Sequence, residues 1–255
     1  MFSLKGKTAI VIGGGGGIGQ AIAKGLAMAG ADVSIASRGE EKLKKACAKI
    51  KEESGCTVGY YTCDVTSEEA IEKLAADFVK DHGHVDILVN SQGYNKKYSA
   101  FDHPMDEWDR TFEVNVKSIL MCCKHFGRYM RDQKYGRIIN VSSIGATRSK
   151  MSDISVAYGS SKGAVNGLTI NLAAGWGQYG ITVNALCPIM TRTEMMVPIF
   201  EKNPELVTGT AARVPVGRIG EPEDNIAPAV FFASDEAAFI NGQIIYVDGG
   251  LTTLQ

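Results

Sequence analysis

The 255-residue chain has no excess of charge of either sign, because 27 lysines and arginines offset 28 acidic residues and leave a formal net charge of −1. It therefore lacks the basic field that gathers nucleic acid or an anionic membrane. No hydrophobic run approaches the length of a membrane span, and the start MFSLKGK lacks the apolar segment of a signal peptide. We expect a cytoplasmic protein with no nucleic-acid or membrane partner.

Metal and disulfide patterns are also missing. The six cysteines include no C-x-x-C pair, and the four histidines form no matching cluster. Reduced thiols and no metal site are therefore expected. Only 7 prolines occur, and no Pro/Gly/Ser-rich linker or change of composition divides the chain. The length suits one globular domain, so we predict a single domain over residues 1–255.

Short apolar, β-branched runs alternate with helix-length segments. The predicted strands cover 8–12, 32–37, 58–64, 86–90, 137–143, 181–187 and 243–248. The predicted helices cover about 18–29, 40–53, 67–81, 106–132, 156–176 and 222–233. Strands that are apolar throughout and alternate with helices indicate a parallel sheet covered on both faces. The prediction is a Rossmann-type, doubly wound α/β domain of about seven strands.

Five consecutive glycines, Gly13 to Gly17, follow the first predicted strand. Such a run is costly inside an ordered element, so it needs a reason. The run satisfies two dinucleotide-binding spacings at once, one through Gly14, Gly16 and Gly19 and one through Gly13, Gly17 and Gly19. A helix that begins near Ile18 points free N–H groups at this turn, which suits a pyrophosphate. The setting favours a dinucleotide site over an ordinary glycine turn.

The second predicted strand ends at Ser37 and Arg38, with no acidic residue to hold a ribose 2′-hydroxyl. Ser37 leaves room for a 2′-phosphate, and the planar donor fork of Arg38 suits one. The pattern favours NADP(H) as cofactor, with NAD(H) as the alternative. A solvated arginine at the end of a strand is the other interpretation of Arg38.

The stretch AYGSSKGAV places Tyr158 and Lys162 four residues apart on a predicted helix, so they share one face. A nearby ammonium lowers the pKa of a tyrosine, which then serves as an acid/base near neutral pH. The strand 137–143 delivers Ser143 to the carboxyl edge of the sheet, where its hydroxyl can hydrogen-bond a substrate oxygen. A Tyr-x-x-x-Lys pair alone is common, and its combination with the glycine turn and Ser143 makes the pattern specific.

On these residues the chain resembles the short-chain dehydrogenase/reductase family, from TAIVIGGGGGIG to INGQIIYVDGG. The resemblance implies NAD(P)-dependent hydride transfer between a secondary alcohol and a ketone. It implies a catalytic tetrad of Asn115, Ser143, Tyr158 and Lys162, in which Tyr158 exchanges the proton and Lys162 binds the nicotinamide ribose. Ser143 would orient the substrate oxygen, and Asn115 would hold a water of the proton relay. A homo-oligomer, most often a tetramer, is also implied.

The cofactor contacts that the sequence and the resemblance together indicate are spread over the whole chain. They are Gly13, Gly17, Ile18, Gly19, Ser37, Arg38, Asp64, Val65, Asn90, Gly93, Tyr158, Lys162, Pro188, Thr191 and Thr193. Some positions depart from the family pattern, namely Ile12 for threonine, Gln92 for alanine and Ile189 for glycine. The loop between Ser143 and Tyr158 is longer than usual. These departures concern specificity rather than chemistry.

The candidate substrate residues are mostly basic or carry amides, which suits a polar, anionic, polyhydroxylated small molecule. They are Gln92, Tyr94, Asn95, Lys96, Arg148, Lys150 and Arg192. Solvated loop residues are the alternative interpretation. The tail that begins at NPELV resembles the gluconate 5-dehydrogenase and polyol dehydrogenase branch, with a substrate loop at about 189–216.

Two other functions stay open from the sequence. Much of the tail also resembles 3-oxoacyl-carrier-protein reductases, which would need a basic docking surface for an acidic partner. The sequence places four cations near one another, and a solvated helix end explains them equally well: Arg128, Arg131, Lys134 and Arg137. A nicotinamide-binding regulator would be expected to lose the tetrad. All four tetrad residues are present, which argues against a regulator.

Overall fold

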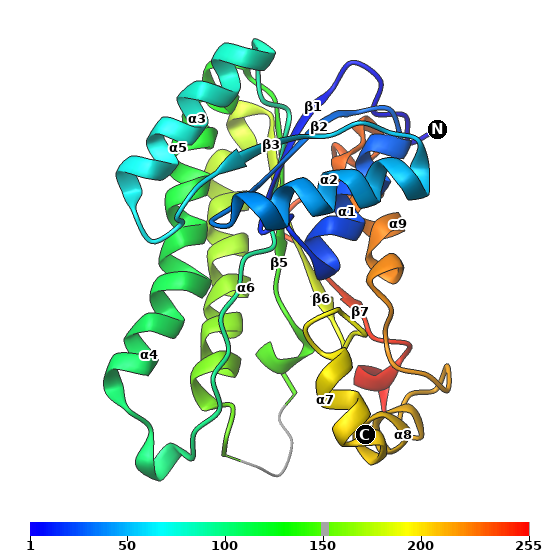
Figure 1. The fold of residues 1–255 in the computed structure, drawn as a ribbon. Coiled ribbons are helices and arrows are strands. Elements are labelled where there is room, and N and C mark those ends of the chain that lie inside the picture. The colour runs from blue at the N-terminus through cyan, green and yellow to red at the C-terminus, as the bar shows by residue number, and fades with distance from the viewer. Residues whose placement is uncertain (149–152, 255) are drawn as a thin grey trace.

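The computed structural model describes residues 1–148 and 153–254, and its strands form one parallel sheet of seven strands (Figure 1). The strands are β1 (Thr8–Ile12), β2 (Asp32–Ser37), β3 (Gly59–Thr62), β4 (Ile87–Asn90), β5 (Gly136–Val141), β6 (Ile181–Pro188) and β7 (Ile244–Val247). Their order in the sheet is β3-β2-β1-β4-β5-β6-β7. Every residue of β1, β4, β5 and β6 is buried, which explains why their sequences are mostly apolar without alternation. The predicted Rossmann-type fold is confirmed.

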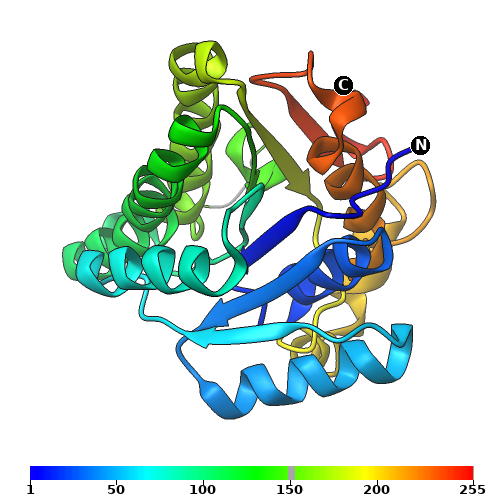
Figure 2. The same ribbon diagram turned by 90° about the horizontal axis from the view of Figure 1, so that it is seen from above.

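Helices cover both faces of the sheet (Figures 1 and 2). On one face lie α1 (Gly17–Met28), α2 (Glu40–Ser54) and α9 (Ile226–Ala233), and on the other lie α3 (Glu68–His82), α5 (Ser118–Gln133) and α6 (Val156–Trp176). Each face has its own apolar cluster, one around Leu26 and Phe232 and the other around Phe78 and Phe126. Burying each of these side chains contributes roughly 2–3 kcal/mol. Among the described helices, none has the length and hydropathy to span a membrane.

The helix predicted over 106–132 is interrupted. It consists of α4 (Met105–Phe112), a single π-helical turn over Glu113–Lys117, and α5. The wider turn accommodates one extra residue and places Asn115 inside the protein, with no exposed surface. Hydrophobic spacing predicts the helix but not this irregularity, because the extra residue leaves both flanking helices amphipathic.

The predicted substrate loop carries two short helices, α7 (Val197–Lys202) and α8 (Pro204–Ala211). Both begin with proline in the first turn, where its missing N–H costs nothing. Figure 1 shows them beside the carboxyl end of the chain, below β6 and β7.

The site lies at the carboxyl ends of the strands, where the strand order reverses. β1 pairs with β2 on one side and with β4 on the other, so the connections from β1 and β4 leave in opposite directions. This reversal opens a crevice above the ends of these strands, and ligands bind there in folds of this kind.

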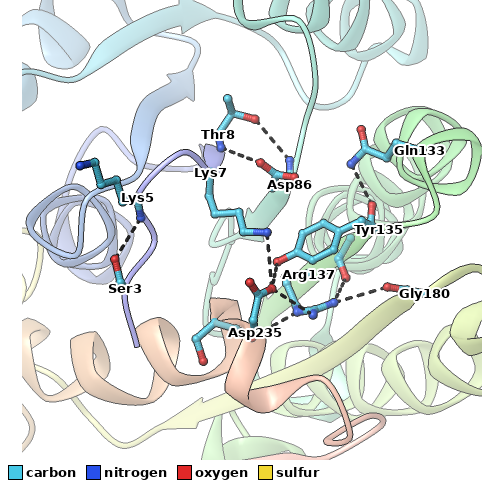
Figure 3. A network of polar contacts seen from close by, with 12 residues as sticks. Ser3, Lys5, Lys7, Thr8, Asp86, Gln133, Tyr135, Arg137, Gly180 and Asp235 are labelled. Carbon is cyan, nitrogen blue, oxygen red and sulfur yellow. Dashed lines mark hydrogen bonds and ion pairs between the residues drawn. The ribbon is translucent and has the colours of Figure 1, made fainter. Parts of the chain in front are cut away.

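Polar side chains close the opposite, amino edge of the sheet (Figure 3). The Asp235 carboxylate accepts a hydrogen bond from the Tyr135 hydroxyl at 2.8 Å and pairs with Lys7 at 3.4 Å. Arg137, only 4% exposed, lies 3.6 Å from the same carboxylate and donates to the Gly180 carbonyl at 3.4 Å. This network ties the starts of β1, β5 and β6 together, far along the strands from the crevice.

The four cations named for a carrier-protein docking surface do not share one environment. Arg137 is buried at the amino edge, whereas Arg128, Arg131 and Lys134 are exposed, and Arg131 pairs with Asp132 at 2.8 Å. The turn after α5 separates the helix from β5, so Arg137 does not contribute to such a surface.

Candidate active site

The glycine turn joins β1 to α1 and leaves no room for side chains. A Cβ on Gly13, where φ is +79°, would lie 2.6 Å from the Gln92 backbone nitrogen, and one on Gly19 would lie 2.5 Å from the Gly13 carbonyl oxygen. Gly16 is the N-cap of α1 and has no side chain to cap the helix, so the first N–H groups of α1 are available to a ligand. A bare backbone at a helix N-terminus fits a pyrophosphate.

The end of β2 adds a hydroxyl and two cations to this turn. The Ser37 Oγ is buried without a hydrogen-bond partner among the described residues, and it lies 3.0 Å from a Cβ position on Gly15. Arg38 is exposed on the cavity wall, and the Lys42 ammonium lies 3.5 Å from a Cβ position on Gly16. An unpaired hydroxyl beside two cations and free backbone N–H groups fits a phosphorylated ribose.

Lys42 is a site residue that the sequence analysis missed. It stands in the first turn of α2, four residues after Arg38. The short connection from β2 to α2 turns this helical turn back toward the glycines. That spacing was the available signal, although lysines are so common on exposed helices that it predicts little alone.

Two predicted cofactor residues differ in where their side chains lie. Thr66 donates to one Asp64 oxygen from its backbone N–H at 3.0 Å and from its hydroxyl at 2.9 Å, and these bonds lower the pKa of the Asp64 carboxyl. Asp64 lines the cavity. Asn90 is fully buried, and its Nδ2 donates to Asn140 Oδ1 at 2.9 Å. Its side chain therefore bridges β4 and β5 instead of facing the cavity.

Ser143, Tyr158 and Lys162 converge above the ends of β5 and β6. The Ser143 side chain has a hydrogen-bonding interaction with the Tyr158 phenol, and both border Gly145, whose Cβ position is 3.4 Å from the Ser143 Oγ. Ser142 is the neighbouring hydroxyl, but its Oγ donates to the Lys162 carbonyl at 3.1 Å. Ser143 is therefore the serine that faces Tyr158.

Burial shifts the pKa values of Tyr158 and Lys162. Burial raises the pKa of Tyr158, and the interaction with Ser143 opposes the rise. Lys162 is 3% exposed, and burial lowers its pKa to about 8. Its Nζ donates to the Val141 carbonyl at 2.8 Å and lies 5.7 Å from the centre of the Tyr158 ring. The predicted lowering of the Tyr158 pKa is not found here, because desolvation outweighs an ammonium that is turned toward the end of β5.

Asn115 pins the start of α6 to the loop after β4. Its Nδ2 donates to the Tyr94 carbonyl and to the Ser161 Oγ, both at 2.9 Å, while its Oδ1 accepts from the Tyr94 N–H at 2.6 Å. Ser161 in turn donates to the Tyr158 carbonyl at 2.7 Å. A Cβ on Gly93 would lie 3.9 Å from Asn115 Oδ1 and 4.0 Å from Lys162 Nζ. Gly93 thus lies between these two residues of the predicted tetrad.

The predicted residues on the amide side of the substrate region are largely engaged by the protein. Gln92 is 7% exposed, and its Nε2 donates to the Ser118 Oγ at 3.0 Å, leaving its Oε1 without a partner among the described residues. The Tyr94 hydroxyl and the Lys96 ammonium each donate to Glu107 at 2.6 Å. Glu107 therefore neutralises the cation that this loop was expected to offer.

The two arginines predicted to bind substrate are both engaged by other parts of the protein. Arg148 donates from Nη2 to the carbonyls of Thr252 at 2.6 Å and Leu254 at 2.8 Å, so it fastens the last turn of the chain to the loop after Ser143. Arg192 lies outside the cavity lining and donates to Glu221 at 3.2 Å. Lys150 lies outside the described residues.

One cavity of about 2110 Å³ brings most of the predicted residues together. The predicted residues that line it are Gly13, Gly17, Ile18, Gly19, Ser37, Arg38, Asp64, Val65, Gln92, Gly93, Tyr94, Asn95, Ser143, Arg148, Tyr158, Lys162, Pro188, Thr191 and Thr193. Asn90, Lys96, Asn115 and Arg192 do not line it. Ile12 and Ile189, two departures from the family pattern, are buried, and Ile189 packs beside Gly220.

The part of the cavity under the substrate loop is more apolar than the sequence analysis expected. Its wall includes Met190, Met195, Met196, Leu206 and Leu251. The prediction rested on the charged residues of the loop, whereas its apolar side chains also line the cavity, Met195 while it stays 76% exposed. Helical spacing within α8 could have indicated Leu206 but not the methionines, which lie outside that helix.

Comparison with known proteins agrees with this geometry. The matching family model, described as Enoyl-(Acyl carrier protein) reductase, covers residues 13–252. The 2-dehydro-3-deoxy-D-gluconate 5-dehydrogenase of Bacillus subtilis is 38% identical over 98% of this chain and 96% of its own. The D-threitol dehydrogenase of Mycolicibacterium smegmatis is 35% identical over 98% and 95%.

A solved structure adds a bound cofactor. The gluconate 5-dehydrogenase of Burkholderia cenocepacia, in complex with NADP and tartrate, is 32% identical, with a TM-score of 0.92 over 100% of this chain and 98% of its own. Sequence and fold agree over nearly the whole length. The chain therefore belongs to the short-chain dehydrogenase/reductase family, whose members are NAD(P)-dependent oxidoreductases.

Proposed function

We propose that this chain is an NADP(H)-dependent oxidoreductase that interconverts a secondary alcohol and a ketone on a sugar acid or polyol. The observation that carries the proposal is the placement of Ser143, Tyr158 and Lys162 in the cavity that also contains the glycine turn. We infer that the whole chain, 1–255, acts as one dinucleotide-binding and catalytic domain, with 189–216 as its substrate loop.

The chemistry divides between the cofactor and the chain. The nicotinamide supplies or accepts the hydride when it is bound. Tyr158 donates its proton to the ketone oxygen in reduction and must accept a proton in oxidation, while Ser143 holds the same oxygen. Burial raises the pKa of Tyr158, so little phenolate is present at neutral pH. The phenolate needed for oxidation becomes more populated as the pH rises toward that pKa. We therefore expect oxidation to accelerate from neutral to mildly alkaline pH.

The proposal is tested by the initial rate of reduced nicotinamide formation at mildly alkaline pH. Sugar acids, polyols, simple secondary alcohols and a steroid are each supplied with NADP and with NAD. Turnover of a sugar acid or polyol supports the proposal. Turnover of the steroid alone contradicts the substrate class. Silence across the panel, followed by reduction of a carrier-bound 3-oxoacyl group, would favour the carrier-protein reductase instead.

Replacing Arg38 with aspartate is expected to shift the ratio of kcat/KM for NADP to that for NAD by roughly 100-fold toward NAD. The substitution removes a charge-assisted phosphate contact and places a carboxylate where the 2′-phosphate would lie. Lys42→Gln is expected to shift the ratio in the same direction by less. Lys45→Gln, an exposed cation of α2 away from the cavity, is the control and should leave the ratio unchanged. An unchanged ratio for Arg38→Asp contradicts the assignment.

A further inference from the structure

We propose that Arg213 receives a carboxylate of the substrate, so that the enzyme discriminates a sugar acid from the corresponding neutral polyol. This inference rests on the proposed function and narrows its substrate class. Arg213 lines the cavity together with Leu206 and Thr210 of α8. Arg213 follows the end of α8 by two residues, and its N–H donates to the Thr210 carbonyl at 3.0 Å. The helical turn therefore continues to Arg213, and spacings of four and three residues place the three side chains on one face. The side chain of Arg213 therefore lies on the same side as those of Leu206 and Thr210, which line the cavity.

The backbone that follows Arg213 is anchored against the carboxyl end of the chain. The Val214 side chain approaches within 2.6 Å of a Cβ position on Gly249, and Pro215 within 3.2 Å of one on Gly250. Leu251, the next residue, lines the cavity. The turn that contains Leu251 is held by Arg148 through the Thr252 carbonyl, and Arg148 belongs to the loop after Ser143. Arg213 therefore lies at the end of the cavity bounded by the C-terminal turn and the Ser143 loop, where Figure 1 shows α8 beside the C-terminus.

Three other cations near the substrate region already have partners. Arg148 donates to backbone carbonyls, Lys96 to Glu107 and Arg192 to Glu221. Lys97, Arg110 and Lys117 line the cavity without an ion pair among the described residues, and the carboxylates of α4 and of the π-helical turn line it with them. Arg38 and Lys42 stand at the glycine turn.

The guanidinium of Arg213 has no ion pair within residues 1–148 and 153–254, and Arg213 is the cavity-lining cation that stands on the substrate loop. The carboxylate on the substrate loop that also lines the cavity, Glu194, pairs with Lys49 at 2.9 Å. Arg213 thus presents an uncompensated positive charge to the cavity.

The chemistry of this end suits a carboxylate. A guanidinium binds a carboxylate through two parallel hydrogen bonds, which fixes orientation as well as charge. The neighbouring side chains of Met196 and Leu206 are apolar and half-buried, so a bound substrate displaces water there and strengthens the ion pair. A neutral polyol of the same length leaves this cation unpaired, and the difference appears as selectivity.

The test compares gluconate with sorbitol, which have the same number of carbons and differ in charge. We expect Arg213→Gln to lower kcat/KM for gluconate by at least about tenfold and to change that for sorbitol by less than about threefold. Arg213→Lys should restore part of the loss, because charge returns without the fork. Lys202→Gln, a cation of α7 outside the cavity lining, is the matched control and should change neither.

A gluconate-to-sorbitol ratio that Arg213→Gln leaves unchanged overturns the proposal, and so does an equal loss on both substrates, which indicates a structural role. If the wild-type enzyme oxidises neither substrate, the proposed function fails instead. Calorimetric titration of the NADP-loaded protein with tartrate then decides about Arg213 separately. Weaker tartrate binding by Arg213→Gln supports a carboxylate site, whereas equal affinity, or no binding by the wild type, overturns it.

Discussion

Tyr158→Phe is expected to lower kcat by roughly 1,000-fold, within the range that general acid–base groups contribute. The variant removes one oxygen from a residue whose ring and backbone have other contacts. The ring carbon Cε1 lies 3.8 Å from a Cβ position on Gly145, and Ser161 donates to the Tyr158 carbonyl at 2.7 Å while accepting from Asn115. The ring should therefore keep its position when the hydroxyl is lost, so that the loss reports on chemistry rather than on folding.

The measurement combines steady-state turnover with titration of NADPH fluorescence. We expect the Kd for NADPH to change by less than about threefold, because the residues of the glycine turn are untouched. Tyr129→Phe, an exposed tyrosine of α5, is the matched control and should keep wild-type turnover. A Tyr158→Phe variant that retains more than a tenth of the wild-type kcat would show that another group exchanges the proton.

The sheet and the residues around the glycine turn were predictable because they follow from local patterns. Each central strand is mostly apolar, and a strand, a glycine run and an amphipathic helix occur in an order that only a few folds accommodate. Tyr158 and Lys162 share a helix, so their proximity follows from spacing alone. Ser143 follows a central strand, which fixes the edge of the sheet where it lies.

What the sequence could not predict depends on partners that are distant in the chain. Arg192 pairs with Glu221, and Arg148 binds carbonyls about a hundred residues away, so neither was recognisable as engaged. Arg213 is unengaged for the same reason, since the identity of its neighbours depends on how the substrate loop folds. The direction of the Lys162 ammonium, toward the Val141 carbonyl, likewise depends on how α6 packs against β5. Spacing identifies which residues meet, whereas packing decides their charge and orientation.

Burial of Lys162 lowers the stability of the folded protein. A lysine whose pKa falls from 10.5 to about 8 on burial destabilises the folded protein at pH 7 by about 3 kcal/mol relative to a group with no shift. Loss of its hydrogen bond to Val141 in Lys162→Met offsets about 1 kcal/mol of this amount. We therefore expect Lys162→Met to increase the free energy of unfolding of the cofactor-free protein by about 2 kcal/mol at pH 7. The same change should lower kcat at least about 100-fold, because the charge beside Tyr158 is lost.

The difference in free energy of unfolding between Lys162→Met and the wild type depends on pH. Between pH 10.5 and about 8 the unfolded chain binds a proton at Lys162 before the folded protein does, so the wild type loses stability as the pH falls through this window. Below about pH 8 both states are protonated and the penalty is constant. The advantage of Lys162→Met over the wild type should therefore be largest at pH 7 and fall to less than about half by pH 9.5, as measured by urea unfolding at each pH. A constant difference across this range would mean that Lys162 is not desolvated in the folded protein. A variant that is less stable than the wild type at pH 7 would mean that its ammonium is held by more than the carbonyl at the end of β5.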